Sequence, residues 1–455
     1  MLLTNSISGD ALRERLRGHV AVPADEDYDA VRRGWALGND LRPAAVAMPS
    51  CPEDVREIVV FARANGLRVL VQGTGHNGTP LGDLEDVILV RTGAMRGVEI
   101  DVDARVARIE CGAVWSDVAA PASEHGLAAL AGSAPDVGVV GYCVGGGLGW
   151  LGRRYGLCCE RVLSFDVVTA DGRLVRADRD NEPDLFWALR GGGGSYAAIV
   201  GLEMELVPMP AVTAGMMVYG WERAREVVQA WRAFTATAPD TVTTSMRILQ
   251  IPDLPVAPDF LRGRGVVIID GAVVAGAVHA AAVLSPLRAL GPEVDTFADV
   301  PPVALSHIHM DPEEPMEGVS EHAILDSLPS EAVEAMIAGF GEDSGSPLTM
   351  VELRHLGGAL ARPGSGALSR LPGGYLLFAA GAVAEPEHTA ATKAAFARLL
   401  NTMAPWSSDR ANQNFAERPR TPEALYGEEA STRLRAVRMA YDPDRLFLGA
   451  HAPRG

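Results

Sequence analysis

Apolar and polar positions in the first part of the chain predict a helix followed by a strand. Apolar residues recur at helical spacing from Val55 to Ala62, after Ser50-Cys51-Pro52-Glu53, which is typical of a capping box with proline in the first turn. The run 67–72 is apolar enough for a buried strand, and it leads into a glycine cluster.

The pattern up to residue 210 predicts a mixture of hairpins and helices. Alternating segments at 97–112 and 162–177 predict hairpins, which turn near Asp101–Ala104 and at Asp171-Gly172. Further strands are expected at 87–92 and 198–208, and helices at 114–125 and 182–190. Adjacent hairpins among helices indicate an α+β fold rather than a strictly alternating parallel sheet.

The residue pattern of the chain changes after Pro208-Met209-Pro210. Prolines become frequent there, between strand-like runs such as 265–270 and 349–356. We therefore predict one domain over residues 1–210 and a second over 211–405. The segment 406–455, which ends in a helical run and DPDRLFLG, is expected to return to the first domain.

Composition and charge exclude several functional classes. The 455 residues are 48% hydrophobic and 22% charged, which is ordinary globular composition. A net charge of −18 does not provide the excess of positive charge that binding to nucleic acid or to an anionic membrane requires. The single lysine, Lys393, excludes a P-loop and disfavours Schiff-base chemistry.

The cysteines and the N-terminus predict a soluble cytoplasmic protein. A monomer or a homodimer is expected. Five cysteines without a CxxC spacing are typical of small buried residues in a reducing compartment. The first twenty residues lack the basic and apolar regions of a signal peptide, and no apolar run reaches 18 residues.

Three glycine clusters offer bare backbone to a bulky anionic ligand. They lie at 72–78, 145–152 and 191–194, each beside a predicted strand or helix end. Glycine permits positive φ and allows amide groups to converge on phosphate oxygens.

Two other interpretations of local motifs are weaker. Gly147–Gly152 matches GxGxxG and Asp171 follows about 20 residues later, but the next segment is short for a Rossmann helix and Asp171 sits in a hairpin turn. His307-Ile308-His309 with Asp311 suggests a metal site, but no cysteine is near and a loop is equally natural. We therefore predict no metal.

Five linked segments resemble the FAD-linked oxidases related to berberine bridge enzyme, within the vanillyl-alcohol-oxidase superfamily. They are QGTGHNG, GSAPDVGVVGYCVGGGLGWLGRRYGL, DVVTADG, DLFWALRGGGGSYAAIV and YGEEASTRLRAVRMAYDPDRLF, in the family's order and spacing. The resemblance implies a PCMH-type FAD-binding domain of two subdomains. It also implies a substrate domain with an antiparallel sheet and flanking helices.

The same resemblance implies how FAD is held. His76 takes the position of the 8α-histidyl bond, and Ala134 stands where many relatives carry a second, cysteinyl attachment, so one bond is expected. The remaining cofactor-binding residues carried over from the family are Gly73, Thr74, Gly75, Asn77, Pro135, Asp136, Val137, Gly141, Gly145, Val200 and Asn414. The small Val137 occupies the position of an oxygen gate, which favours dioxygen as electron acceptor.

The catalytic base does not carry over from the family. Several relatives use a tyrosine in a Tyr-x-Asn-Phe segment, where this chain has Asn412, and an amide is no base at neutral pH. A period of two places Glu352 and Arg354 on one face of the strand at 349–356, as a candidate base and a candidate anion holder. A solvated strand face with an ion pair is the alternative for this pair, and Tyr142 is a further catalytic candidate.

Together these features predict an oxidase that acts on an alcohol, amine or hydroquinone-like group of a small organic metabolite and uses O2. The alternative is a flavin-bearing binding or cyclisation protein with a vestigial redox role, which the replacement of the tyrosine by Asn412 favours.

Overall fold

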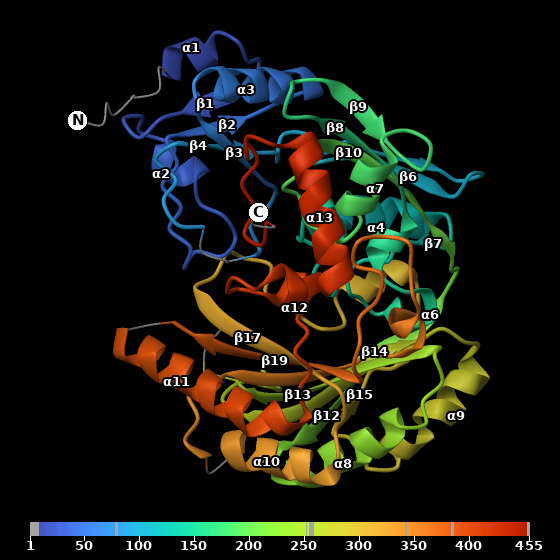
Figure 1. The fold of residues 1–455 in the computed structure, drawn as a ribbon. Helices are drawn as coiled ribbons and strands as arrows, with labels where there is room; N and C mark the ends of the chain where they lie inside the picture. The colour runs from blue at the N-terminus through green and yellow to red at the C-terminus, as the bar shows by residue number, and fades with distance from the viewer. Residues whose placement is uncertain are drawn as a thin grey trace.

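The computed structural model describes residues 9–77, 81–251, 253, 259–341, 344–383 and 386–452. Gly78, part of the first glycine cluster, lies outside them. Figure 1 shows two halves: one holds the N-terminal elements and α13, and the other holds a broad sheet with helices beneath it.

The first sheet has the order β1-β2-β4-β3. Its strands are β1 (His19–Ala21), β2 (Ala45–Met48), β3 (Arg68–Gln72) and β4 (Val87–Arg91), and β4 pairs in parallel with both β2 and β3. The short helices α1 (Gly9–Arg13) and α2 (Tyr28–Val31) precede the parallel strands. The apolar face of α3 (Pro52–Ala64) packs on this sheet with Ile58, Val59 and Val69 in one core. The expected helix and strand are confirmed.

The predicted capping box at residues 50–53 is wrong. Cys51 is the N-cap residue of α3 and makes no side-chain cap, while the backbone N–H groups of Ser50, Arg17 and Gly18 all donate to the carboxylate of Asp54. Asp54 therefore binds both the local backbone at Ser50 and the N-terminal segment, and these contacts replace the predicted box.

The second sheet is antiparallel and has the order β5-β6-β10-β8-β9. Its strands are β5 (Val98–Asp101), β6 (Val106–Glu110), β8 (Val162–Val168), β9 (Leu174–Ala177) and β10 (Ala198–Glu205). Both predicted hairpins form. The predicted strand 198–208 is divided, because β11 (Val207–Pro208) leaves the sheet to pair with β7 (Leu127–Ala128).

Four helices belong to this part of the chain. They are α4 (Trp115–Glu124), α5 (Val139–Val144), α6 (Gly152–Tyr155) and α7 (Pro183–Leu189). Trp115, Val139 and Leu185 share one core with strand residues of the second sheet. Leu151, just before α6, lies in the same core, so the glycine-rich loop between α5 and α6 is anchored on both sides.

A third, antiparallel sheet has the order β15-β12-β14-β13-β18-β19-β17, with β16 also paired to β12. Its strands are β12 (Val212–Gly220), β13 (Val242–Gln250), β14 (Gly265–Val273), β15 (Val294–Asp295), β16 (Ala298–Val300), β17 (Gly318–Leu325), β18 (Met350–His355) and β19 (Tyr375–Ala382).

Helices α8 (Ala224–Thr235), α9 (Ala277–Arg288), α10 (Ser330–Phe340) and α11 (Pro386–Met403) lie on the far side of this sheet from the N-terminal half (Figure 1). Trp231, Met336 and Phe396 from these helices form one core with Val351 and Leu353 of β18. Because side chains alternate along a strand, Glu352 and Arg354 are on the opposite face.

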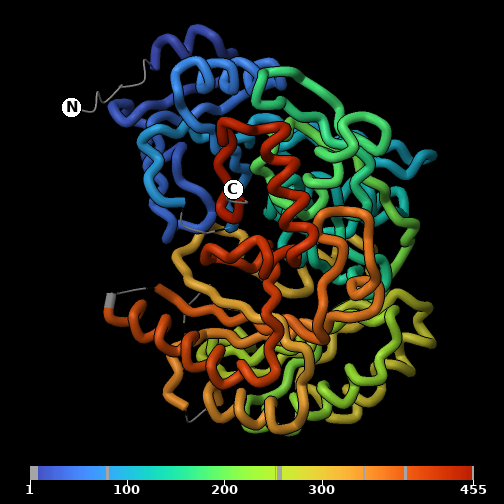
Figure 2. Tube along the Cα trace, viewed as in Figure 1, coloured from blue at the N-terminus to red at the C-terminus, as the bar shows by residue number. Residues whose placement is uncertain are grey.

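The C-terminal segment lies beside the N-terminal half. Figure 2 shows the red end of the tube running beside the blue and green parts. After α12 (Pro422–Tyr426), α13 (Glu428–Tyr441) packs on α7, and Val69 of β3 then exchanges backbone hydrogen bonds with Leu446 and Leu448 at 2.8 Å. The α+β fold is confirmed.

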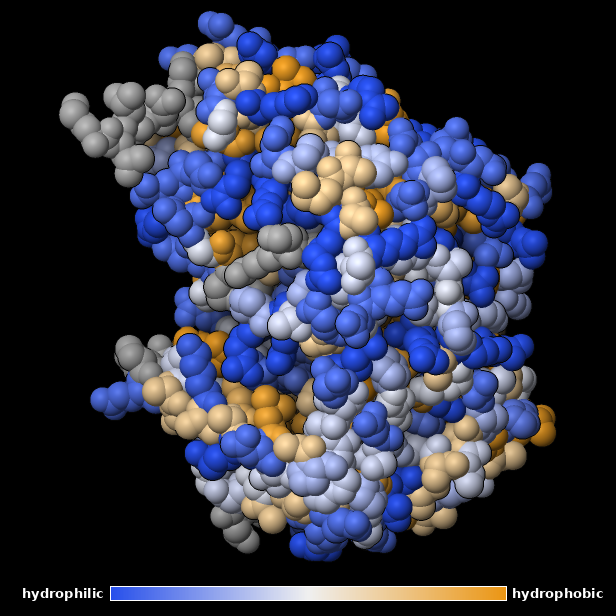
Figure 3. Space-filling view, viewed as in Figure 1, coloured by the Kyte–Doolittle hydropathy of each residue, from blue (hydrophilic) through white to orange (hydrophobic). Residues whose placement is uncertain are grey.

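The surface in Figure 3 is mostly hydrophilic around α13 and is indented at the left edge, where the two halves meet. None of the described helices combines the length and the apolar composition that crossing a bilayer requires.

Candidate functional site

A cavity of about 390 Å³ runs between the glycine clusters and the third sheet. It is bounded by the loop after β3, by α5 and the loop that follows it, by the cluster 192–195 and by the C-terminal segment. Its lining includes Gly73, Thr74, Gly75, His76, Asn77, Val137, Gly141, Tyr142, Gly145, Arg354 and Asn414. The structure thus brings most of the predicted site residues to one cavity.

The backbone of this cavity is bare where a large ligand needs to approach. A Cβ atom added at Gly141 or Gly194 would meet no atom within 4 Å, so a side chain there would project into the cavity. Tyr142 and His451 line the cavity, and their buried Oη and Nε2 atoms have no hydrogen-bond partner among the described residues. A long cavity with exposed main chain and unused polar atoms fits an extended, polar cofactor.

His76 lies on the cavity wall, at the end of the loop that follows β3. Its side chain is 19% exposed, its ring stacks on Trp35 with 4.2 Å between ring centroids, and its Nε2 lies 2.9 Å from Oδ2 of Asp136. The ring is therefore held in one orientation at the edge of the cavity.

Asn414 joins the C-terminal segment to the glycine-rich loop. Its Oδ1 accepts a hydrogen bond from the Gly147 N–H at 2.9 Å, and its Nδ2 donates to the carbonyl of Tyr142 at 3.2 Å. A Cβ on Gly145 would lie 2.4 Å from that Nδ2, so only glycine permits this approach.

Asn412, which replaces the expected tyrosine, is fully buried and has a structural role. Its Oδ1 accepts from the Asn414 N–H at 2.9 Å, and its own N–H donates to His322 Nε2 at 3.1 Å. Burial, followed by the positive charge of Arg420, lowers the pKa of His322 to about 3, so the ring stays neutral and accepts this hydrogen bond.

Glu352 and Arg354 do share a face of β18, and that face is buried rather than solvated. Arg354 Nε donates to Glu352 Oε1 at 2.8 Å, and the Glu352 side chain is 0% exposed. Arg354 lines the cavity and lies over the Phe415 ring, whereas Glu352 lies behind it, and Glu352 Oε2 has no hydrogen-bond partner among the described residues.

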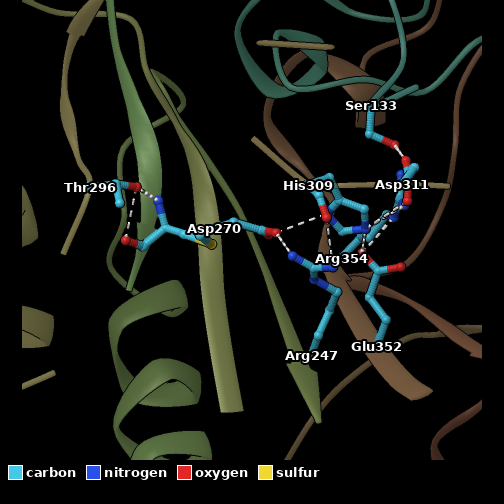
Figure 4. A network of polar contacts seen from close by, with 9 residues as sticks. Ser133, Arg247, Asp270, Thr296, His309, Asp311, Glu352 and Arg354 are labelled. Atoms are coloured by element: carbon cyan, nitrogen blue, oxygen red, sulfur yellow. Dashed lines mark hydrogen bonds and ion pairs between the residues drawn. The ribbon is translucent and has the colours of Figure 1, made fainter. Parts of the chain in front are cut away.

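These two residues belong to a larger buried network (Figure 4). His309 Nδ1 lies 2.8 Å from Asp270 Oδ2 of β14, and its Nε2 lies 3.5 Å from Glu352 Oε1 and 3.4 Å from an Nη of Arg354. Arg247 of β13 pairs with Asp270 and also donates to the His309 carbonyl at 2.9 Å.

Asp311 completes the network at the cavity wall. Its Oδ2 accepts a hydrogen bond from Ser133 Oγ at 2.6 Å, and Ser133 lines the cavity. The network thus contains three carboxylates, two guanidinium groups and one imidazole. Burial alone would raise the pKa of Asp270, but Arg247 and His309 outweigh burial and lower it to about 2.

The sequence pattern does not connect these residues. It offers His309 and Asp311 only as members of a possible metal site, and it suggests no role for Asp270 or Arg247. Charged residues inside apolar strand runs are the available signal, since such a charge needs a buried partner. Within the described part of the chain, no group of three or more His, Cys, Asp or Glu side chains is arranged to hold a metal ion.

Tyr142 lines the cavity, and its ring packs edge-on against Trp115. Burial raises the pKa of its phenol well above the ordinary value. The hydroxyl therefore stays protonated and can donate or accept a hydrogen bond, but it is a poor base.

Three predicted cofactor residues do not line the cavity. Pro135 and Asp136 lie behind Val137, where the Pro135 carbonyl accepts from the Ser116 N–H at 2.8 Å. Val200 lies at a bulge of β10, and its carbonyl accepts from the Cys111 N–H at 3.1 Å, while its neighbour Ile199 lines the cavity.

The GxGxxG match does not form a dinucleotide-binding turn. Gly147–Gly152 leads into α6, which has only four residues, and Asp171 binds Thr169 and Arg173 within the hairpin turn. A Rossmann site requires a longer helix and a carboxylate at the end of a parallel strand.

Comparison with known proteins bears on the nature of the cavity. Residues 43–178 match the family described as FAD binding domain. This segment is similar to an FAD-binding domain. This segment contributes the His76 loop and the glycine-rich loop to the cavity wall.

Curated relatives support this assignment over part of the chain. (R)-6-hydroxynicotine oxidase from Paenarthrobacter nicotinovorans is 33% identical over 195 residues, which is 43% of this chain and 43% of that protein. The chain spans about half, or less, of the length of the curated relatives it matches.

Solved structures show the shared fold over nearly the whole chain. BBE-like 1 of Physcomitrella patens covers 98% of this chain and 98% of its own, with a TM-score of 0.84 and 18% identity. The grass pollen allergen Phl p 4, described as having glucose dehydrogenase activity, covers 98% of this chain and 99% of its own, with a TM-score of 0.84 and 19% identity. The predicted resemblance to the berberine-bridge-enzyme-like, PCMH-type FAD-binding group is confirmed.

Proposed function

We propose that the chain is an FAD-dependent oxidoreductase, an oxidase of small organic molecules, with FAD attached through an 8α-histidyl bond to His76. The observation that carries this proposal is that His76 and Arg354 line one cavity, from the FAD-binding domain and from the third sheet respectively. Ala134 also lines this cavity and offers no thiol for a second bond. One attachment is therefore proposed.

The residues proposed to hold the cofactor follow from the same cavity. They are Gly73, Thr74, Gly75, Asn77, Val137, Gly141, Gly145 and Asn414, with Pro135, Asp136 and Val200 behind the wall. Backbone groups of the loop 73–77 suit phosphate oxygens, because glycine allows the main chain to approach closely.

When bound, FAD supplies a two-electron acceptor for hydride from the substrate. In this proposal Glu352, which lies behind Arg354, accepts through one intervening water the proton that leaves the substrate O–H or N–H group. Arg354 binds the substrate oxygen and holds Glu352 Oε1 in place. Tyr142, which stays protonated, donates a hydrogen bond from the opposite wall.

The acceptor of the electrons is proposed to be dioxygen, which enters past the small side chain of Val137. A variant of Phl p 4 with one isoleucine replaced by valine is described as a glucose oxidase, whereas the wild-type protein is described as a glucose dehydrogenase. The names of the relatives support an alcohol- or amine-bearing substrate. A cytoplasmic location and a monomeric or homodimeric state stay predictions.

The test is a denaturing gel viewed under ultraviolet light, followed by oxygen uptake with a panel of alcohols, amines and hydroquinones. Wild-type protein is expected to fluoresce and His76→Ala to be dark while it still binds FAD. A dark wild-type band with flavin released by acid removes the covalent bond from the proposal. A purified chain that binds no FAD under any condition overturns the proposal as a whole.

The buried, structural Asn412 favours a second candidate, a flavin-bearing binding or cyclisation protein without redox turnover. Protein that stays oxidised with every compound in the panel, yet binds one of them tightly, supports this candidate over the oxidase.

A further inference from the structure

The imidazole of His76 is held from two directions by residues outside the cavity lining. Trp35 covers one face of the ring at an interplanar angle of 19°, and Asp136 accepts a hydrogen bond at Nε2. Neither residue lines the cavity, whereas His76 does. Because Asp136 occupies Nε2, Nδ1 is the ring nitrogen that remains for another bond.

Trp35 is fixed to the same loop that carries His76. The Trp35 N–H donates to the carbonyl of Thr74 at 2.9 Å, and the Ala36 N–H donates to the carbonyl of Gly75 at 3.1 Å. Gly75 has φ of +78°, and a Cβ on it would lie 2.9 Å from the Cα of Gly34. The segment 34–36 therefore lies directly on the loop, at a distance that no side chain at Gly75 would permit.

The other half of the molecule also holds this segment. The Met316 N–H donates to the Trp35 carbonyl at 3.2 Å, and the Leu37 N–H donates to the Met316 carbonyl at 3.1 Å, just before β17. The backbone of Trp35 is thus held from two directions. These contacts fix the position from which its indole stacks on His76.

The backbone on both sides of Asp136 is also fixed by hydrogen bonds. The carbonyl of Pro135 accepts from the Ser116 N–H at 2.8 Å, and the carbonyl of Val137 accepts from the Trp115 N–H at 3.0 Å. These bonds attach both neighbours of Asp136 to the first turn of α4. Its Oδ1 is buried without a hydrogen-bond partner among the described residues, so the contact with His76 is the principal polar contact of this carboxylate.

We propose that Asp136 and Trp35 are positioning residues for the attachment of flavin to His76. Asp136 keeps the proton of the imidazole on Nε2, so the Nδ1 lone pair faces the cavity, and Trp35 fixes the plane of the ring. A carboxylate beside imidazole also stabilises the positive charge that develops when the other nitrogen forms a bond. This inference rests on the proposed function.

Nδ1 of His76 forms a bond to the methyl carbon at position 8 of the isoalloxazine, and one C–H bond of that methyl group breaks. The proton on Nε2 is released through Asp136. Two electrons pass to the ring system of the cofactor and then to dioxygen, which leaves as hydrogen peroxide with the two protons.

The experiment follows attachment rather than turnover. Full-length protein produced with little riboflavin is mixed with FAD in air, and covalent flavin is measured over time by fluorescence of the denatured band. Flavin released by acid gives the non-covalent fraction, and a thermal melt reports folding. The variants are Asp136→Asn, Trp35→Ala and Trp35→Phe, with His76→Ala as the dark control.

Asp295→Asn is the matched control for Asp136→Asn. Asp295 is an aspartate of β15 that pairs with Arg288, and its side chain is 26% exposed, against 25% for Asp136. It lies in the third sheet, where it pairs with Met217, and does not contact His76. We expect attachment to proceed at the wild-type rate in this variant.

Asp136→Asn and Trp35→Ala are expected to slow attachment by about tenfold or more while total bound flavin stays within a factor of about two. Trp35→Phe, which retains an aromatic face, is expected to recover most of the rate. Attachment at the wild-type rate in both Asp136→Asn and Trp35→Ala overturns the inference and leaves the proposed function intact.

If Asp136→Asn does not fold, Asp136→Glu tests the inference instead, because it restores the carboxylate. Recovery of attachment in Asp136→Glu supports the proposal, and folded Asp136→Glu that binds flavin but never attaches it overturns the proposal. A wild-type chain that binds FAD without attachment instead contradicts the covalent part of the proposed function.

Discussion

His309 Nδ1 lies 2.8 Å from Oδ2 of Asp270, and both side chains are buried between the third sheet and the glycine-rich loop. Trp150 of that loop packs against the imidazole with 5.4 Å between ring centroids. The pair therefore joins the sheet to the FAD-binding part of the molecule. It also presents Nε2 of His309 to Glu352 and Arg354.

Asp270→Asn is expected to destabilise the fold. The substitution leaves the buried Arg247 without its carboxylate, and removing one partner of a buried pair costs about 3–5 kcal/mol. The free energy of unfolding in urea measures this loss. Asp295→Asn is the control, because its ion pair with Arg288 is more exposed and is worth about 1 kcal/mol or less. Equal stability of the two variants would contradict this account of the network.

His322 gives a prediction for the dependence of stability on pH. Its pKa in the folded chain is lowered from 6.5 to about 3, so the unfolded chain binds a proton at this site between those values and the folded chain does not. This contribution to stability is complete above pH 6.5 and is lost as the pH falls toward 3. The expected slope is up to about 1.4 kcal/mol per pH unit for this group.

Urea unfolding of wild type and His322→Gln at pH 7, 6, 5 and 4 measures that slope. Glutamine can still accept the hydrogen bond from the Asn412 N–H but does not titrate. The variant is expected to lose less stability than wild type between pH 6.5 and 4. Parallel curves for the two proteins would show that His322 does not contribute to the acid sensitivity.

The parts of the site that the sequence predicted are local in the chain. The loop 73–77 follows its strand directly, and the glycines around Gly141 and Gly145 are close neighbours, so their pattern is visible without tertiary information. His76 and Asn414 came from the resemblance, and the structure brings both to the same cavity. The domain boundaries at 210 and 405 stay a prediction.

The buried network was not predictable in the same way. Asp270, His309 and Glu352 come from β14, a loop and β18, and only the pairing of β13 with both strands brings them together. The side-chain period of two along a strand placed Glu352 and Arg354 on one face, but it does not indicate whether that face is exposed to solvent or buried. The capping error had a related cause, since Asp54 binds the backbone of residues 17 and 18 as well as that of Ser50.

Glu352→Gln tests the proposed base. With a compound that reduces the flavin in the oxygen-uptake panel, we expect the anaerobic rate of flavin reduction to fall by about 100-fold or more. Glu321→Gln is the control, because Glu321 is also a buried carboxylate of the third sheet and pairs with Arg420. A rate for Glu352→Gln within a factor of about two of wild type would exclude Glu352 as the base.

Val137→Leu tests the route of dioxygen without requiring a substrate. The side chain of Val137 lines the cavity, and one additional methylene group there is expected to slow reoxidation of the flavin by about tenfold. The protein is reduced by light under anaerobic conditions and mixed with air-saturated buffer, and the return of the oxidised absorbance gives the rate. Val140→Leu, a substitution of the same size at another lining residue, is the control. Equal reoxidation in Val137→Leu and wild type would mean that dioxygen reaches the flavin by another path, whereas slow reoxidation in wild type itself would indicate a dehydrogenase.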